Sequence, residues 1–563
     1  MSQRAKAKRR DPLQTGNKDL VFLPLGGAGE IGMNLNLLGH GGKWLMLDLG
    51  VSFGDDTSPG IEVIMPDPQF IVGLRESLIG LVLTHAHEDH IGAVQYLWSR
   101  LRCPMYATPF TASVLRRKLR EVGLEDRAPI TEVPPSGTFE LGPFGIELIT
   151  LTHSIPEPNA VVIRTAAGNV LHTGDWKFDP DPLIGPVSDE AALRRVGDEG
   201  VLALVGDSTN VFREGTSGSE AEVRESLTEL VGKYDTRIAI GCFASNVARL
   251  ETIAAAAEAN GRHAALIGRS LWRIYDSARE NGYLTDIPKF LTEHEAGFLP
   301  RDKVLLACTG SQGEPRAALT KIATGNHPEI VLESGDVAIF SSRIIPGNEK
   351  AIGRLHNALA ALGVEVISEK DHFIHVSGHP ARDELTHMYQ LVRPKIAVPV
   401  HGETRHLIEH AELARSCQVP EAVVIGNGQA VRLAPGSAEI VAEVPHGRLA
   451  VDGSVLVPIE GPALAERKRL MWNGMAVATI VLNGQGGLVA EPQITLQGIA
   501  DDPTIEDLRG MIADAIEDAV EGLPMARRRS DEEVGEAARR AVRRTLRELR
   551  GKRPPTEVHV VRV

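Results

Sequence analysis

The sequence predicts a multidomain α/β protein, and two observations support this prediction. The chain has 563 residues, too many for one hydrophobic core, so roughly two to four domains are expected. Short apolar runs typical of buried strands are followed directly by histidines and aspartates in the first part of the chain. From about residue 217 the pattern changes to a regular alternation of helices and short strands, which predicts a separate α/β domain.

The composition is that of an ordinary globular protein, with 43% hydrophobic and 24% charged residues. The net charge of −14 argues against a general nucleic-acid coat protein, although it allows a local basic channel around metal ions. Four cysteines without paired spacing predict a reducing compartment. Neither a membrane-length apolar run nor a signal core is seen, so the chain is predicted to be cytoplasmic and not membrane-bound.

The first predicted strand, 21–25, is followed by a glycine-rich stretch with the spacing Gly27-x-Gly29-x-x-Gly32. Asp48 lies at about the distance that a dinucleotide-binding fold requires. However, no amphipathic helix follows the glycines. Two apolar runs, 33–38 and 44–49, instead predict a β-hairpin. We therefore interpret the glycines as turns and close backbone approaches beside a functional site. The segment 50–68, rich in Gly, Asp and Pro, is predicted to be a loop near that site.

The most informative stretch follows the apolar run 81–83 and contains His85, His87, Glu88, Asp89 and His90. Residues two apart on an extended backbone project from the same face, so the first two imidazoles would point the same way. Neutral imidazole and carboxylate are the ligands that zinc and manganese prefer. A polar surface loop is a poor alternative, because so many histidines beside a buried strand would need partners.

The same arrangement recurs along the chain, because predicted strands deliver His153, Asp175 and Asp207 at their ends, and a later strand, 396–400, delivers His401. Strand ends are where rigid sheets present catalytic residues. Each of these residues alone would more often be structural. Together with the first cluster they predict a metal site.

Other segments leave more than one interpretation open. The basic helix predicted at 110–121 is either an exposed structural face or a polyanion contact. The last hundred residues predict a small α+β unit with strands at 475–482, 488–496 and 558–563 and helices at 505–520 and 532–550. Its arginines are open to contact with RNA or with solvent alone.

These motifs resemble the metallo-β-lactamase superfamily, through His85-x-His87-x-Asp89-His90, His153, Asp175 and a late histidine. The domain inserted before that histidine resembles the β-CASP branch, which acts on nucleic acids. Stretches such as 24–32, 172–175, 207–210, 309–315, 345–349, 375–379 and 399–403 are similar to bacterial ribonuclease J. The sequence departs from the pattern of this family at a few positions, such as Trp176 and Pro380, but none of these departures removes a predicted metal ligand.

The resemblance implies a fold and a division of the chain. The fold is an αββα sandwich with an inserted β-CASP domain and a small C-terminal α+β domain. The predicted division is a basic disordered tail 1–17, a lactamase part 18–216, a β-CASP domain 217–368, a second lactamase part 369–448, a linker 449–466 and a C-terminal domain 467–563.

The resemblance also implies two Zn²⁺ per chain, with Mn²⁺ as an alternative. One ion would be held by His85, His87 and His153, the other by Asp89, His90 and His401, with Asp175 bridging. So many N and O ligands exceed one tetrahedral ion but suit a pair about 3.5–4 Å apart, which would supply hydroxide at neutral pH. Asp89 would also orient the hydroxide, and His379 would protonate the departing 3′ oxygen. A structural role is the alternative for His379.

A 5′-monophosphate pocket is further implied, formed by His375, Val376, Ser377, Gly378 and His379 with Ser245, Asn246, Ser311 and Arg343. Such a pocket would explain 5′→3′ exonuclease trimming of single-stranded RNA in RNA maturation and mRNA decay, and endonuclease cuts would need RNA to enter without that anchor. A homodimer or tetramer formed through the C-terminal domain and partners in an RNA-decay complex are family-based expectations.

Three alternative functions remain to be compared, of which only the last belongs to another class. A small-molecule metallo-hydrolase would place its last histidine soon after Asp175, whereas His401 follows a whole domain later. A β-CASP DNA-repair nuclease would be distinguished from a ribonuclease by comparing the trimming of matched RNA and DNA oligomers. A non-catalytic RNA-binding protein would lack ligands, and none is missing here.

Overall fold

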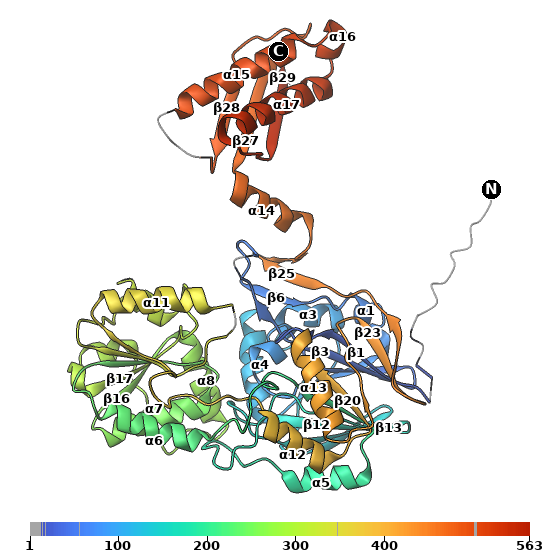
Figure 1. Ribbon diagram of the computed structural model, residues 1–563, viewed down its shortest axis with the longest axis vertical. Coiled ribbons are helices and arrows are strands. Elements are labelled where there is room, and N and C mark those ends of the chain that lie inside the picture. Colours follow the sequence, from blue (N-terminus) through green and yellow to red (C-terminus); the bar gives the residue numbers. More distant parts are fainter. Residues whose placement is uncertain (1–12, 14, 17, 56, 346, 500–503) are drawn as a thin grey trace. The chain divides into compact units, whose positions relative to one another are not determined.

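The protein is described by a computed structural model at residues 13, 15–16, 18–55, 57–345, 347–499 and 504–563. The chain divides into two compact units (Figure 1). The larger unit comprises the chain up to residue 52 and residues 65–447, and the smaller comprises residues 53–64 and 448–563. No helix within these described ranges is both long and apolar enough to cross a membrane.

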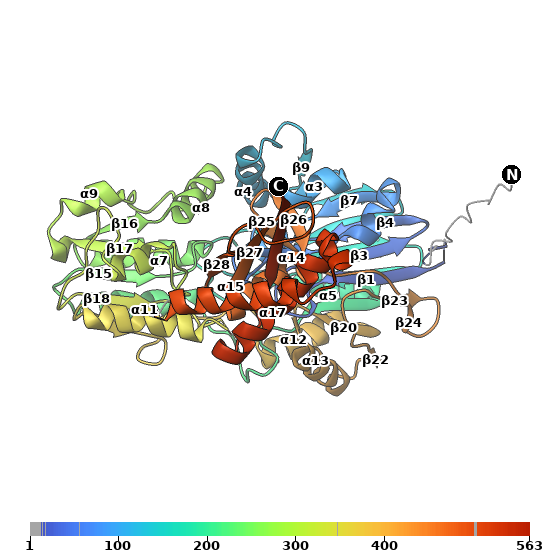
Figure 2. The same ribbon diagram turned by 90° about the horizontal axis from the view of Figure 1, so that it is seen from above.

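The larger unit is built around two β-sheets that pack face to face (Figures 1 and 2). Phe22 and Leu45 from the first sheet and Ile146, Val161 and Val205 from the second belong to one apolar core between them, each at most 2% exposed. The first sheet has the order β24-β23-β1-β3-β4-β7-β8-β9. Its strands are β1 (Leu20–Gly26), β3 (Leu35–His40), β4 (Lys43–Leu47), β7 (Leu78–Val82), β8 (Met105–Ala107), β9 (Ile130–Glu132), β23 (Gln429–Ala434) and β24 (Glu439–Glu443).

The second sheet has the order β10-β11-β12-β13-β14-β20-β22. Its outer face packs against helices through Leu193, Met388 and Leu413, which completes the helical layer on this side. Its strands are β10 (Thr138–Leu141), β11 (Phe144–Thr150), β12 (Asn159–Thr165), β13 (Gly168–His172), β14 (Ala203–Asp207), β20 (Ile396–Val400) and β22 (Glu421–Ala422). The helices are α1 (Gln69–Val72), α2 (Glu88–Ile91), α3 (Val94–Leu101), α4 (Pro109–Glu121), α5 (Glu190–Glu199), α12 (Arg382–Val392) and α13 (Thr404–Ser416), with a 3₁₀ turn at Arg75–Ser77. The predicted αββα sandwich is confirmed.

Local sequence explains the two predicted hairpins. Between β3 and β4, Gly41 and Gly42 have φ of 57° and 72°, the positive values that a tight two-residue hairpin turn requires. The strands pair antiparallel with His40 opposite Lys43. The hairpin β12–β13 likewise pairs Val161 with His172. The first hairpin excludes the dinucleotide-binding interpretation of the glycine-rich stretch, as expected.

The basic tail predicted at 1–17 lies mainly outside the described residues. Where its end is described, Leu13 and Thr15 are each 7% exposed. The backbone N–H of Gly42 donates to the carbonyl and hydroxyl oxygens of Thr15, at 2.8 and 3.2 Å. The prediction of disorder is therefore wrong at these positions, because an apolar side chain and a hydrogen-bonded turn hold them against the β3–β4 hairpin.

The inserted domain is a five-stranded parallel sheet with the order β16-β17-β15-β18-β19. Ala239, Leu306 and Ala338 from its strands pack with Leu319 and Leu355 from its helices. The strands are β15 (Ile238–Gly241), β16 (His263–Ile267), β17 (Val304–Cys308), β18 (Val337–Phe340) and β19 (Glu365–Ile367). The helices are α6 (Glu220–Val231), α7 (Val247–Ala259), α8 (Arg269–Glu280), α9 (Glu293–Gly297), α10 (Ala318–Ala323) and α11 (Glu349–Ala361), with a 3₁₀ turn at Arg301–Lys303.

The predicted basic helix is α4, and its arginines are used in ion pairs. Arg117 pairs with Glu280 of α8, and Arg116 pairs with Glu132 of β9. Glu121 at the end of α4 also receives a hydrogen bond from Arg273 of α8, at 2.7 Å. These pairs favour the structural interpretation of this helix over contact with a polyanion.

The smaller unit contains a three-stranded sheet with the order β28-β27-β29. Ala478 and Ile480 on one face of this sheet pack against Ile512, Val542 and Leu546 from two helices. Its strands are β27 (Met475–Leu482), β28 (Gln493–Gln497) and β29 (Thr556–Arg562), and its helices are α14 (Pro462–Asn473), α15 (Ile505–Glu521), α16 (Met525–Arg528) and α17 (Asp531–Arg550). A further sheet has the order β26-β25-β6-β5, with β5 (Ser52–Phe53), β6 (Val63–Pro66), β25 (Arg448–Asp452) and β26 (Val455–Pro458).

Three segments are more regular, or differently bounded, than the sequence predicts. The expected linker 449–466 contains most of the hairpin β25–β26 and the start of α14, because Gly453 with φ of 61° permits a tight turn between two short apolar runs. The expected loop 50–68 contributes β5 and β6. The strand expected at 488–496 starts later, at Gln493, and only Leu488 forms an isolated bridge before it.

Candidate metal centre

Three of the predicted ligands, His85, His87 and His153, meet at one point in the larger unit. The first two lie in the turn between β7 and α2, and His153 follows β11. The Nδ1 atom of His87 lies 3.0 Å from Nε2 of His85 and 3.0 Å from Nε2 of His153. Ligand atoms around one tetrahedral zinc ion, with bonds of about 2.0–2.1 Å, are separated by roughly 3.3 Å. The three imidazoles are therefore spaced as one ion requires.

A second group is formed by Asp89, His90 and His401, and Asp175 lies between the two groups. Nε2 of His401 lies 3.0 Å from Oδ2 of Asp89. Oδ2 of Asp175 lies 3.1 Å from Nε2 of His90 and 3.9 Å from Nε2 of His85. In each group, with Asp175 included, the ligand atoms all lie within 4.8 Å of one another. The sequence-predicted ligands are thus all brought together.

Burial sets the protonation states of the first group. It lowers the pKa of His85 and His153 well below the ordinary value, and the neighbouring histidines lower it further. Burial also lowers the pKa of His87 to about 4. These rings are therefore neutral at physiological pH, the form in which imidazole binds a metal.

The second group is more strongly coupled to carboxylates. Burial opposes the charged form of His90, but Asp175 and Asp89 raise its pKa well above the usual value. Burial would likewise raise the pKa of Asp175, yet His401 and His90 hold it well below its usual range. Oδ1 of Asp175 is buried and has no hydrogen-bond partner among the residues described. Nδ1 of His401 lies 3.6 Å from this oxygen, beyond hydrogen-bond distance. A buried charged oxygen that accepts no hydrogen bond is costly, so this donor set fits divalent cations.

For His90 and His401, the second ring nitrogen is held by a partner that sequence analysis did not assign to the site. Asp48, fully buried, accepts a hydrogen bond from Nδ1 of His90 at 2.7 Å. Its carboxylate also accepts from the backbone N–H and the hydroxyl of Thr84, at 2.8 and 2.9 Å. Nδ1 of His401 contacts the hydroxyl of Thr209 at 2.8 Å. Such partners fix the tautomer that leaves Nε2 free to bind a metal.

His379, the predicted proton donor, lies at the edge of the cluster. Its Nδ1 atom donates to Oδ2 of Asp207 at 2.8 Å and lies 3.8 Å from Oδ2 of Asp175. Burial disfavours its charged form, but the two carboxylates raise its pKa above the ordinary value. His379 and Asp207 also form a third group of potential ligands with Asp175 and His401.

The glycine-rich stretch approaches the site as predicted. The backbone N–H of His401 donates to the carbonyl of Gly27 at 2.6 Å.

Gly378 lies against His153, and its carbonyl oxygen contacts Nδ1 of that ring. A Cβ atom at Gly378 would lie 2.6 Å from Cε1 of His153, so only glycine fits without displacing the ring.

The residues predicted to hold a 5′-phosphate come from two regions that the structure connects through Asn210. Its side-chain amide donates to the hydroxyl of Ser377 at 2.7 Å and to the carbonyl of His379 at 3.0 Å, and its oxygen lies 3.4 Å from Nη1 of Arg343. Nδ1 of His375 is buried without a hydrogen-bond partner among the described residues. Burial and the charges of nearby arginines lower the pKa of His375 well below its ordinary value.

The remaining predicted pocket residues lie at the ends of β15 and β17. Asn246 caps α7, and its side-chain oxygen accepts from the backbone N–H of Arg249 at 2.8 Å. Ser311 is 2% exposed, and Ser245 is partly exposed. Val376, in the segment 375–379, is buried. Asn246 thus has a structural partner already. In this region sequence analysis missed Asn210, although it lies in the strand-end stretch 207–210 that drew attention to Asp207.

Sequence comparisons agree with this architecture domain by domain. The family model described as "Metallo-beta-lactamase superfamily" matches residues 32–240, and "Ribonuclease J, beta-CASP domain" matches 235–359. "Zn-dependent metallo-hydrolase RNA specificity domain" matches residues 363–420, and "Ribonuclease J C-terminal domain" matches 462–563. A crystal structure of a protein of unknown function from Enterococcus faecalis covers 74% of this chain and 100% of its own, with a TM-score of 0.51 and 14% identity, a likeness of fold alone.

The fold and the ligand set define a metal-dependent hydrolase of the metallo-β-lactamase superfamily with a β-CASP insertion. Ribonuclease J of Sinorhizobium meliloti is 45% identical over 97% of this chain and 98% of its own. Ribonuclease J of Mycolicibacterium smegmatis is 38% identical over 94% and 96%, and that of Thermus thermophilus is 37% identical over 92% of each. The chain therefore belongs to the ribonuclease J family and is a metal-dependent nuclease with a divalent-metal site and an RNA-specificity domain. The DNA-repair and small-molecule alternatives are not favoured.

Proposed function

We propose that this protein is a two-metal ribonuclease that trims RNA from a 5′-monophosphate end in the 5′→3′ direction and also cuts internally. The observation that carries this proposal is the pair of ligand groups that share Asp175. A single ion would leave ligands of the other group without a partner.

The proposed ligands are divided as the geometry suggests. His85, His87 and His153 would hold one Zn²⁺, and Asp89, His90 and His401 the other, with Mn²⁺ as the alternative metal. When bound, the two ions would lower the pKa of a shared water toward ~7 and offset charge on the phosphoryl oxygens.

The chain's own groups would manage the protons. Asp89 would orient the attacking water from its position beside His401. His379 would carry the proton that the departing 3′ oxygen needs, since Asp207 and Asp175 favour its protonated form. Asp207 also fixes the direction of the imidazole through Nδ1, so that Nε2 is the atom available to donate.

The direction of trimming would follow from a pocket that accepts a terminal monophosphate. His375–His379, Ser245, Asn246, Ser311 and Arg343 are its proposed lining. The contact of Asn210 with Arg343 and Ser377 supports a connected pocket. Nδ1 of His375 is buried and has no hydrogen-bond partner in the described part of the chain, so it is a polar atom that a ligand could satisfy. Each cut would regenerate the 5′-phosphate that the pocket recognises, whereas internal cuts would occur without that anchor.

Further assignments follow from the same proposal. The substrate would be single-stranded RNA in rRNA maturation and mRNA decay, in the cytoplasm. A homodimer or tetramer formed through the C-terminal domain, and partners in RNA decay, are part of the proposal. So is the division of the chain into a lactamase part 18–216, a β-CASP domain 217–368, a second lactamase part 369–448 and a C-terminal domain 467–563.

The test compares 5′-monophosphate with 5′-triphosphate RNA, with zinc or manganese added, for wild type, His87→Ala and Arg343→Gln. Wild type should release mononucleotides from the monophosphate substrate alone. His87→Ala should lose hydrolysis of both substrates. Arg343→Gln should weaken the preference for the monophosphate, whereas Arg354→Gln, which removes an exposed arginine of α11, should not. Equal trimming of both RNAs by wild type would refute the phosphate pocket, and activity in His87→Ala would refute the metal mechanism.

A further inference from the structure

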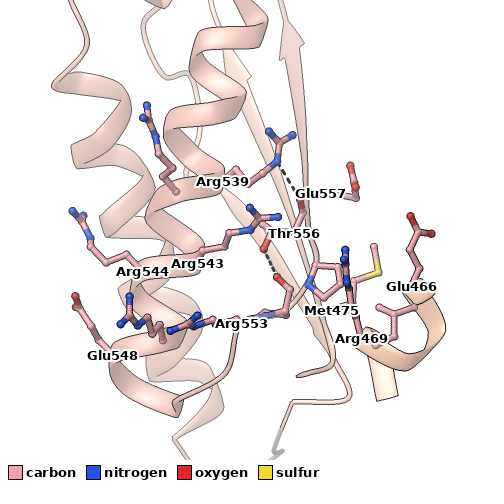
Figure 3. Close-up of a pocket in the computed structure, with 15 residues that line it drawn as sticks. Glu466, Arg469, Met475, Arg539, Arg543, Arg544, Glu548, Arg553, Thr556 and Glu557 are labelled. Carbon is pink, nitrogen blue, oxygen red and sulfur yellow. Dashed lines mark hydrogen bonds between the residues drawn. The ribbon is translucent and has the colours of Figure 1, made fainter. Parts of the chain in front are cut away.

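The smaller unit contains a cavity of about 1250 Å³ for which the nuclease chemistry has no use. It is bounded by α14, by the C-terminal half of α17 and by the residues that lead into β29 (Figure 3). Seven arginines and three glutamates line it. A net positive lining of this size is unexpected in a chain whose net charge is −14.

Most of the guanidinium groups in this arginine basin are not neutralised. Arg539 is engaged, since it donates to Glu536 at 2.7 Å and to the carbonyl of Thr556 at 3.3 Å. The side chains of five others, all exposed, have no ion-pair partner within the described part of the chain: Arg469, Arg543, Arg544, Arg547 and Arg553.

The placement of these arginines on α17 costs helix stability. Arg539, Arg543 and Arg547 follow one another at intervals of four residues, as do Arg540 and Arg544. Like charges at this spacing destabilise a helix. The helix macrodipole favours cations only in the last turn, and α17 ends at Arg550, so the dipole does not explain the arginines two turns earlier. A ligand of opposite charge would offset this repulsion.

We infer that the arginine basin binds the phosphodiester backbone of single-stranded RNA, outside the nuclease site. Guanidinium groups match phosphate oxygens in planar, two-point contacts. The volume exceeds the about 300–1,000 Å³ usual for small-molecule sites, which favours a segment of polymer. The helix that contributes Arg469 also carries Trp472, whose side chain is 70% exposed, and exposed aromatics beside basic grooves stack on unpaired bases. The choice of RNA as the polyanion rests on the proposed function.

The test is RNA binding by the full-length chain in a His87→Ala background, which suppresses cleavage. A labelled single-stranded RNA is titrated at several salt concentrations with Arg543→Gln/Arg547→Gln and with the matched variant Arg527→Gln/Arg529→Gln. The matched variant removes the same charge from the same unit but outside the basin. Loss of two phosphate contacts should reduce the slope of log K against log salt by about 1.4 and weaken binding about 25-fold at 0.1 M salt.

A second variant, Arg543→Lys/Arg547→Lys, keeps the charge and should bind RNA within about threefold of the parent. If Arg543→Gln/Arg547→Gln binds RNA as tightly as its matched control, the inference is overturned. The same result would be obtained if the basin accepts a protein partner and not RNA. Trimming of a short 5′-monophosphate RNA in the wild-type background is measured in parallel. Failure of that reaction would refute the proposed function. The binding experiment would still test separately whether the arginine basin binds RNA.

Discussion

The substitution Asp48→Asn tests whether the residue behind a proposed ligand controls metal binding. In the wild type, Oδ2 of Asp48 accepts from Nδ1 of His90 and from the hydroxyl of Thr84, while Oδ1 accepts from the backbone N–H of Thr84. Asparagine has nearly the same shape. Its oxygen would continue to accept from the backbone N–H, which leaves its NH₂ group facing His90.

The reason for a large effect is a change of tautomer. An amide NH₂ group cannot accept a hydrogen bond from Nδ1–H of His90. Nδ1 must therefore become the acceptor of a hydrogen bond from the amide, and the proton of the imidazole must move to Nε2. Nε2 is the atom that faces Asp175, at 3.1 Å, and a protonated nitrogen cannot bind a metal. Loss of a partner of this kind lowers metal affinity about 10–100-fold, which corresponds to about 1.4–2.7 kcal/mol.

Competition with a chromophoric chelator measures the effect on Zn²⁺ affinity. One of the two binding steps should weaken, because His90 belongs to one ligand group only, and hydrolysis of RNA should fall with it. Asp126→Asn, which changes an exposed aspartate in the same unit, serves as the control and should leave both steps unchanged. Affinities for Asp48→Asn within twofold of the wild type would show that the tautomer argument is wrong.

Three further predictions concern other parts of the same unit. Gly378→Ala should reduce activity about 100-fold or more, since the new Cβ would displace His153, as turnover of RNA would show. Burial lowers the pKa of His410 to about 4 from 6.5. The unfolded chain therefore binds this proton first as pH falls, and the free energy of unfolding should drop by about 2.2 kcal/mol more between pH 6.5 and 4.5 in wild type than in His410→Gln, measured by urea unfolding. Asp207→Asn removes a charge that raises the pKa of His379, so the alkaline limb of the pH–rate profile should move to lower pH.

Each of these predictions has a control within the chain. Gly353→Ala in α11 meets no atom within 4 Å and should stabilise the helix by up to about 1 kcal/mol without loss of activity; equal activity of the two glycine variants would contradict the close contact. Identical pH slopes for wild type and His410→Gln would mean that the buried ring is protonated in the folded state. An alkaline limb that persists unchanged in Asp207→Asn would assign it to a group other than His379.

Most of the proposed ligands could be predicted from sequence because they follow a strand within a few residues, whereas Asp89 and His90 lie in the short helix α2 that comes after β7. His85, His153 and Asp175 come within a few residues of a buried run, and a parallel arrangement brings such ends together. The partners behind them could not be predicted in the same way. Asp48 also follows a strand, but nothing in its spacing indicates that it accepts a hydrogen bond from His90 rather than facing solvent.

Elements were hardest to predict where apolar runs are short. The hairpin β25–β26 has only a few buried residues, so its pattern is too weak to separate from a linker. The arginines of α4 were left open because their partners, such as Glu280, lie far along the sequence. Charge patterns on one helix do not show which distant carboxylates neutralise them.

The proposed ligands are distributed over the chain from His85 to His401, with the inserted domain between Asp175 and the last of them. A polypeptide still emerging from the ribosome, or one ended by a premature stop codon within the insertion, lacks that last imidazole. Its cluster would be incomplete even if the first sheet had already formed. On the proposed ligand set, the second metal site can therefore form only after the chain has been translated as far as His401.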